Sequence, residues 1–428
     1  MENMFHAGVL AALTGGFLAG SLIADDAVRP NVLFILADDW GWGDLSCHGH
    51  PILKTPNLDR FAKEGMEFRQ FTADSPVCSP SRAAFITGKY PGRFSIQYIF
   101  EPQSKRSCPM PDWLDVHAVM LPRLFHEAGY KTAHFGKWHL TAEDAPSAPS
   151  VFEYGYDEAC IWTGSNGPQI LDLPEKYRPE EYHLLNGQKN DPQLWGVRSE
   201  MAVRKAMEFM EANKDQSFFV NLHIHEGHTP LAPLPSSRLP YKDVPEPEQT
   251  YYAAVGNADR FLGELFAFLD KNELRDNTIV IFTSDNGPEV PVPNPKDLRF
   301  GARGETGGFK GRKRSLFEGG VRVPFVVRWP GRVPAGSVNE KTVLTAVDML
   351  PTLCAAAGVP MPEGYTSDGE NMLSAFLGKK ILRTKPIFWS YFYTPKVMRG
   401  GVEVPWPPVF RKSGGPITGR ICRSGTGT

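Results

Sequence analysis

Two short and almost uninterrupted apolar segments constrain the fold of this chain more than any other feature. They are residues 31–37 and 277–283, and neither alternates polar with apolar side chains. A strand with this pattern is covered on both faces, as in a parallel sheet flanked by helices. Residues 218–223 form another apolar segment. The sequence therefore predicts an α/β fold with a large mixed, mostly parallel sheet between layers of helices.

Three other segments carry apolar residues at helical spacing. Residues 55–65 begin with Thr-Pro and end with Gly, while residues 251–269 and 343–358 continue the same periodicity over longer stretches. Such start and stop residues are typical of helix ends. We expect these helices to supply core stripes and assign them no chemistry.

Polar residues follow both apolar strands. Asp38 and Asp39 follow the first, and Asp285 and Asn286 follow the second. Ligands collect at the carboxyl ends of strands in open α/β sheets, and an all-oxygen set suits Ca²⁺ or Mg²⁺ better than zinc. The alternative is that the Asp pair caps a helix or turn and that Asp-Asn-Gly is an ordinary turn.

The run from Cys78 to Gly88 predicts a helix with an anion-binding N-terminus. Pro80 suits the first helical turn and Gly88 suits the position just past the end, so Cys78 opens the helix and Arg82 lies one turn in. Free N–H groups, the helix dipole and a guanidinium then face one point, which suits a tetrahedral oxyanion. The alternative is a buried cysteine beside a capped helix.

The Cys-Ser-Pro-Ser-Arg run, with Thr87-Gly88 in place, resembles the modification signature of the type I sulfatases. In that family a formylglycine-generating enzyme oxidises the cysteine to formylglycine. The resemblance extends from about residue 29 to 389 and implies an alkaline phosphatase-like fold. It also implies one calcium ion, held by Asp38, Asp39, the modified Cys78, Asp285 and Asn286.

Further segments resemble the family's cationic motifs. Gly136-Lys137-Trp138-His139 matches G-K-x-H, His228 takes the histidine of P-H-x-P although Gly227 replaces the proline, and Lys313 takes the lysine before E-G-G-x-R-V-P. Lys310 competes with Lys313 for that role. His223 and His225 have the simpler interpretation of polar groups at a strand end. A further sulfate-side hydroxyl can be placed only among Thr163, Ser165 and Asn166.

The resemblance also implies the role of each group. A hydroxyl of hydrated formylglycine, bound to the cation, attacks sulfur. Arg82, Lys137 and Lys313 stabilise the developing charge, and His228 protonates the departing alcohol. His139 then takes a proton from the second hydroxyl as sulfate is expelled.

The N-terminus and the overall charge bear on localisation and partners. A formal net charge of −2 over 428 residues argues against an electrostatic nucleic-acid binder. Residues 7–24 are apolar apart from Thr14 and Ser21, as in a signal peptide over residues 1–24. The preceding residues lack Lys and Arg, so an uncleaved membrane anchor is the alternative. We expect a secreted or periplasmic protein.

We expect a catalytic domain over residues 29–365 and a smaller C-terminal subdomain over 366–428. The family usually continues through a further antiparallel sheet, so this subdomain is predicted to be truncated, with a disordered tail from residue 414. Five cysteines remain besides Cys78 in a total of 6, and an odd number predicts no complete disulfide framework.

The resulting hypothesis is a sulfuric ester hydrolase that acts on a sulfated mono- or oligosaccharide. The enzymatic alternative is a phosphonate or phosphodiester hydrolase of the same superfamily. The non-enzymatic alternative is an inactive protein that binds sulfated glycans.

Overall fold

A computed structural model describes residues 29–102, 108–142, 145, 147–162 and 198–391, and the backbone of residues 398–399, 402–403 and 411–412. The predicted signal peptide, the positions Thr163, Ser165 and Asn166, and the tail from residue 414 lie outside these residues. Within the described part, no helix has both the length and the apolar character needed to cross a membrane.

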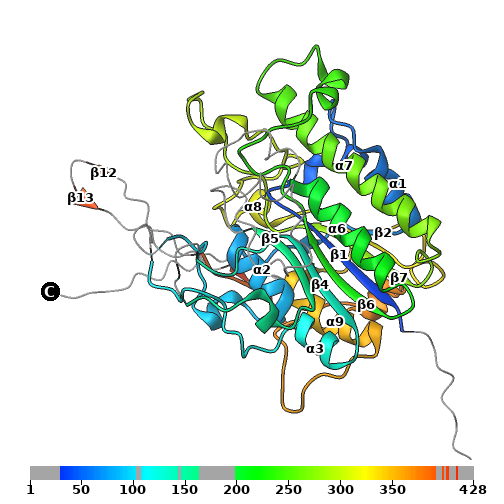
Figure 1. The fold of residues 1–428 in the computed structure, drawn as a ribbon. Coiled ribbons are helices and arrows are strands. Elements are labelled where there is room, and N and C mark those ends of the chain that lie inside the picture. The colour runs from blue at the N-terminus through cyan, green and yellow to red at the C-terminus, as the bar shows by residue number, and fades with distance from the viewer. Residues whose placement is uncertain are drawn as a thin grey trace, which may run out of the picture.

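An eight-stranded sheet forms the centre of the molecule, in the order β5-β4-β6-β1-β7-β8-β2-β9 (Figure 1). Strands β5, β4, β6, β1 and β7 are parallel, and β8 runs antiparallel to both of its neighbours. This confirms the predicted mixed, mostly parallel sheet. The strands are β1 (Asn31–Ala37), β2 (Met66–Phe68), β4 (Lys131–Lys137), β5 (Glu158–Trp162), β6 (Phe218–His223), β7 (Thr278–Ser284), β8 (Phe325–Arg328) and β9 (Ser337–Asn339).

Helices cover both faces of the sheet (Figure 1). Those on one face are α1 (Pro56–Glu64), α6 (Arg198–Ala212) and α7 (Glu248–Lys271). Those on the other are α2 (Cys78–Thr87), α3 (Leu121–Glu127) and α9 (Met349–Ala357). Two one-turn helices, α8 (Glu318–Val321) and α10 (Leu373–Phe376), are the remaining α-helices among the described residues.

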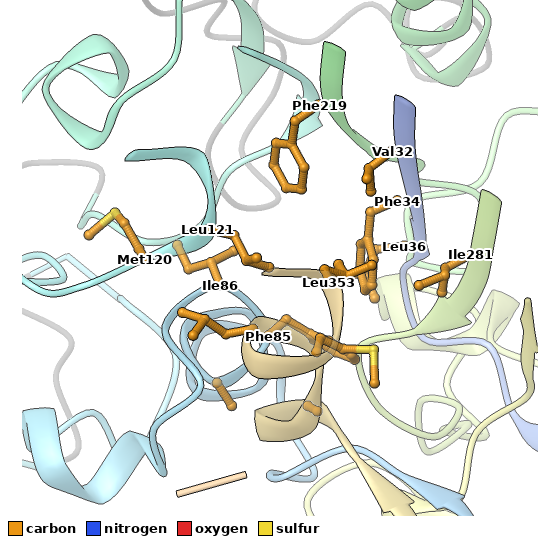
Figure 2. Close-up of a cluster of buried hydrophobic side chains, with 14 of the residues drawn as sticks. Val32, Phe34, Leu36, Phe85, Ile86, Met120, Leu121, Phe219, Ile281 and Leu353 are labelled. Atoms are coloured by element: carbon orange, nitrogen blue, oxygen red, sulfur yellow. The ribbon is translucent and has the colours of Figure 1, made fainter. Parts of the chain in front are cut away.

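Alternate residues of the central strand β1 contribute to two different cores. Leu33 and Ile35 pack toward α1, α6 and α7. The alternate residues Val32, Phe34 and Leu36 pack toward α2, α3 and α9. Figure 2 shows the second core, where Phe34 faces Phe85 of α2 at a ring-centroid distance of 5.3 Å. Each fully buried aromatic or aliphatic side chain stabilises the fold by about 1.5–3 kcal/mol. Burial on both faces explains why the strand sequence lacks polar alternation.

The helix predicted over residues 343–358 is wrong in its first part. Leu344–Thr345 form a short strand, β10, paired in parallel with β3 (Phe71–Thr72), and helix α9 begins only at Met349. The hydroxyl of Thr345 donates to the carbonyl oxygen of Thr72 and to Asp74 at 2.9 and 2.6 Å. These long-range bonds outweigh the local helical periodicity. The remaining short strands are β11 (Phe388–Trp389), paired with β14 (Arg411–Lys412), and β12 (Met398–Arg399), paired with β13 (Val402–Glu403).

Candidate active site

The carboxyl ends of strands β1, β4 and β7 meet the N-terminus of helix α2. Strand β1 leads into Asp38 and Asp39, β7 leads into Asp285, and β4 ends at Lys137. Helix α2 starts with Cys78. All five side chains are buried, with exposed fractions of 0–1%. The sheet topology therefore brings together groups that lie up to 247 residues apart in the sequence.

The acidic groups form a compact cluster that fits a hard cation. One ligand atom each from Asp38, Asp39, Cys78 and Asp285 lies within 4.8 Å of all the others. The amide nitrogen of Asn286 donates to Asp39 Oδ1 at 2.7 Å and to the carbonyl oxygen of Gly287 at 2.8 Å. Its oxygen Oδ1 is buried and has no hydrogen-bond partner among the described residues. Three carboxylates and an unpaired amide oxygen make a donor set suited to calcium.

Three cationic side chains surround the same carboxylates. Lys137 Nζ lies 2.7 Å from Asp38 Oδ2, and Lys313 Nζ lies 2.6 and 2.7 Å from the two oxygens of Asp39. Arg82 donates from Nε and Nη2 to Asp285 Oδ2 at 3.0 and 2.7 Å. In this buried setting each charge is compensated by an opposite one.

The two neighbouring aspartates have opposite pKa shifts. Burial raises the pKa of both carboxyls, but the neighbouring Lys137, together with His228, His225 and Arg82, holds the pKa of Asp38 well below its usual value. For Asp39, burial outweighs the ion pair with Lys313, and the carboxylates of Asp38 and Glu289 add to it, which raises its pKa to about 7. Asp38 is therefore the firmly ionised member of the pair.

Cys78 lies at the junction of the acidic and basic groups. Its sulfur is 3.6 Å from Asp38 Oδ1 and 3.5 Å from Lys137 Nζ. Burial, together with the Asp285 carboxylate, raises the pKa of the thiol. An unmodified Cys78 is therefore a protonated and weakly nucleophilic group at this position.

The structure brings Lys313, and not Lys310, to the acidic cluster. Lys313 is 3% exposed and contacts Asp39, whereas Lys310 is exposed and its Nζ lies 4.4 Å from the centre of the Phe317 ring. The flanking Arg314 pairs with Glu289. The basic run is thus divided between one buried lysine and cations nearer the surface.

The two candidate acid–base histidines have different surroundings. His228 Nδ1 lies 2.7 Å from the carbonyl oxygen of Thr229 and donates to it, because a carbonyl oxygen can only accept. The other ring nitrogen of His228, Nε2, lies 3.9 Å from Asp39 Oδ2. His139 is buried, and its Nδ1 has no hydrogen-bond partner among the described residues. Burial and nearby Lys137 lower the pKa of both rings well below the usual value. Both imidazoles are therefore neutral at pH 7.

Two further residues contribute to the site although no sequence motif assigned them a role. His223, the last residue of β6, accepts a hydrogen bond from Arg82 Nη1 at 3.0 Å. The same nitrogen of Arg82 donates to the carbonyl oxygen of Lys137 at 2.9 Å. Glu289 lies 3.8 Å from Lys313 Nζ. The sequence signal available for His223 was its position at the end of an apolar strand, like that of Asp38 and Asp39 just after β1.

Gly227, which replaces the proline usual in the family, occupies a backbone position closed to proline. Its φ is +106°, whereas proline is held near −65°. A Cβ atom at Gly227 would lie 2.5 Å from Trp40 Cδ1 and 2.6 Å from the carbonyl oxygen of Asp38. The sequence had suggested that this glycine loosens its loop. It instead packs tightly against the segment that follows β1.

We expect Gly227→Ala to lower the free energy of unfolding by about 2–3 kcal/mol, because it combines a left-handed backbone with a steric clash. Gly331→Ala is the matched control, since its φ is +73° and no atom lies within 4 Å of the added Cβ. We expect the control to lose only about 1 kcal/mol. Denaturant unfolding of both variants measures the difference, and equal losses would show that the packing against Trp40 is unimportant.

Comparisons with known proteins agree with this geometry. The family model described as Sulfatase matches residues 30–359. The N-acetylgalactosamine-6-sulfatase of Canis lupus familiaris is 33% identical over 412 residues, covering 89% of this chain and 73% of the relative. The crystal structure of Ps i-CgsB in complex with k-i-k-neocarrahexaose is 28% identical, with a TM-score of 0.71 and coverage of 90% of this chain and 82% of that one. The phosphonate monoester hydrolase of Agrobacterium radiobacter shares the fold, at 19% identity, a TM-score of 0.61 and coverage of 86% and 82%.

Proposed function

We propose that this chain, which belongs to the sulfatase family and is a sulfuric ester hydrolase, removes sulfate from a sulfated carbohydrate. The proposed reaction uses formylglycine at Cys78 and one calcium ion. The observation that carries the proposal is the convergence of Cys78 with three carboxylates and three cations in one buried cluster. A sulfated carbohydrate is supported by the relative named as an N-acetylgalactosamine-6-sulfatase and by the neighbour crystallised with a neocarrahexaose. Maturation requires a formylglycine-generating enzyme as a partner, and we propose a secreted or periplasmic location.

The residues proposed to hold the calcium ion are Asp38, Asp39, the modified Cys78, Asp285 and Asn286. When bound, the ion supplies a net positive charge that attracts an anionic ester and lowers the pKa of a coordinated hydroxyl. The three carboxylates and three cations of the cluster otherwise balance one another.

Formylglycine at Cys78 supplies the nucleophilic hydroxyl that the protein's own thiol does not. Burial raises the pKa of that thiol and so keeps it protonated. The position at the start of helix α2 adds the positive end of the helix dipole, which favours an anionic sulfuryl group.

We assign Lys137 and Lys313 to the sulfuryl oxygens and Arg82 to a positioning role. Each ammonium group has its shortest contacts with one carboxylate, and its flexible side chain can turn toward a bound sulfate. Arg82 is already committed to Asp285, to His223 and to a backbone carbonyl. A fixed cation on developing charge is typically worth about 3–4 kcal/mol in the transition state.

We assign His228 to protonation of the leaving alcohol and His139 to the proton of the hydroxyl that releases sulfate. His139 is neutral and buried, which suits a base. The lone pair of His228 is at Nε2, because Nδ1–H is held by Thr229. Burial and nearby Lys137 lower the pKa of His228, so this ring gains a proton only when an anionic ester offsets the positive charge around it.

These roles predict that the effect of each variant depends on the leaving group. His228→Ala should lower kcat/KM for a sugar sulfate by about 10²–10⁴ and should affect an aryl sulfate much less, because a phenolate can leave without being protonated. His139→Ala should slow both substrates similarly and let a sulfated enzyme accumulate. Rapid quench followed by intact-protein mass spectrometry detects that species. Equal losses for both leaving groups in the His228 variant, with no adduct in the His139 variant, would reverse the assignment.

The activity itself is tested with protein produced together with a formylglycine-generating enzyme. Mass analysis of the peptide containing Cys78 should show an aldehyde, and aryl sulfate and sulfated monosaccharides should be hydrolysed. An aryl phosphonate tests the superfamily alternative, since preferential hydrolysis of the phosphonate would favour that function. Binding of sulfated sugars without turnover by the aldehyde form would instead favour a glycan-binding protein.

A further inference from the structure

An open cleft with a volume of about 590 Å³ adjoins the buried lysine of the site. Its lining includes Lys313, Arg312, Arg314, Val290, Thr306 and Phe309. The cleft therefore leads from the proposed sulfate position toward the surface and has room for more than the sulfated group itself.

Arg312 is the cation of this cleft whose charge is not compensated. Arg314 pairs with Glu289, and Lys313 pairs with Asp39. Arg312 donates from Nη1 to the carbonyl oxygens of Gly304 and Glu289 at 2.6 and 3.3 Å. Among the described residues, no carboxylate forms an ion pair with Arg312, and its Nε and Nη2 make no hydrogen bond. A guanidinium held in place by carbonyls, with donors to spare, suits a carboxylate or sulfate.

The other surroundings of the cleft fit a sugar ring. Val290, which lines the cleft, is 41% exposed. Phe317, which follows the lining residues Arg314 and Ser315 in the chain, is 51% exposed and has the Lys310 ammonium over its ring. Phe309 is held edge-on against Trp42 at a ring-centroid distance of 5.7 Å. Exposed apolar groups beside an unpaired cation match the C–H face and the anionic substituent of an acidic sugar.

We propose that Arg312 binds a second anionic group of the substrate, a carboxylate or another sulfate on the sugar that occupies this cleft. The proposal rests on the proposed function and narrows the substrate class to oligosaccharides with at least two anionic groups. Arg312 thereby sets specificity, while sulfate release itself depends on the buried cluster around Cys78.

The test compares three disaccharides that share one sulfated sugar. The second sugar is uncharged in the first probe, carries a uronate carboxylate in the second, and carries a sulfate in the third. Wild-type enzyme should prefer at least one dianionic probe over the monoanionic one. Arg312→Gln should lower that preference, as a ratio of kcat/KM values, by about ten- to hundredfold and mainly through KM. The uronate and the second sulfate are separate arms, so the larger change identifies the anion. Arg332→Gln, which removes an exposed arginine on another loop, should leave the ratio unchanged.

Two results would overturn the proposal. One is a wild-type enzyme with no preference for either dianionic probe. The other is an Arg312→Gln variant that loses kcat equally on all three probes, which would mean that Arg312 only holds the loop carrying Lys313. Failure of the proposed function gives a different pattern, because no probe and no aryl sulfate would then be hydrolysed by the aldehyde form.

Discussion

Replacing Cys78 by alanine is expected to lower kcat for an aryl sulfate by about 10⁴-fold or more, as loss of a nucleophile does in other hydrolases. The expected size of the loss follows from geometry. Cys78 Sγ is buried and lies within 3.6 Å of both Asp38 and Lys137. Steady-state rates measured with saturating aryl sulfate and calcium check this expectation.

Two further variants separate loss of chemistry from loss of structure. Cys354→Ala removes another buried cysteine, from helix α9, and should retain activity with at most a modest loss of stability. Cys78→Ser should accumulate a sulfated protein after one turnover, because an unmodified serine has no second hydroxyl with which to release sulfate. Full activity in Cys78→Ala, or in protein whose Cys78 peptide carries only a thiol, would contradict the mechanism.

The strands and the acidic part of the site could be predicted because local sequence determines them. A run such as residues 31–37, without polar alternation, has few stable solutions other than a strand buried on both faces. Parallel neighbours then place their carboxyl ends at one edge, which brings Asp38 and Asp285 together although no contact between them is visible in the sequence.

Other features depend on long-range contacts that the sequence does not reveal. The segment Leu344–Thr345 has helical periodicity but becomes a strand because Thr345 bonds to Thr72 and Asp74. Gly227 resembled a loosening substitution because only its neighbours in space, Trp40 and Asp38, show why the position requires a glycine.

The basic run around Lys313 shows the same limit at the level of single charges. The motif favoured Lys313 but left Lys310 as a competitor, and burial beside Asp39 distinguishes the two lysines. Which arginine of that run is already paired depends on Glu289, a residue that no motif singles out. The distribution of paired and unpaired charge in the cleft is therefore set by the fold rather than by a motif.

Asp285→Ala is expected to abolish detectable sulfatase activity and to remove most of the stabilisation by calcium. The substitution takes away one proposed ligand and leaves the buried Arg82 without the carboxylate that it contacts at 2.7 Å. Breaking a buried ion pair in this way costs about 3–5 kcal/mol of stability even without the metal ion. The calcium-dependent part is separate, because a ligand present at 100 times its Kd stabilises the folded state by about 2.7 kcal/mol.

Thermal unfolding in calcium and in chelator resolves the two contributions. Wild-type protein should show a higher Tm in calcium, and Asp285→Ala should show a lower Tm in both conditions with little difference between them. Asp243→Ala, which removes an exposed carboxylate, is the control for net charge and should behave like wild type. Asp285→Asn keeps the size of the side chain but removes its charge, so it should retain some calcium response while still weakening the contact with Arg82. If calcium raised the Tm of Asp285→Ala as much as that of wild type, the ion would lie elsewhere and the assigned ligand set would be wrong. Zinc in the purified active enzyme would refute the assignment of calcium.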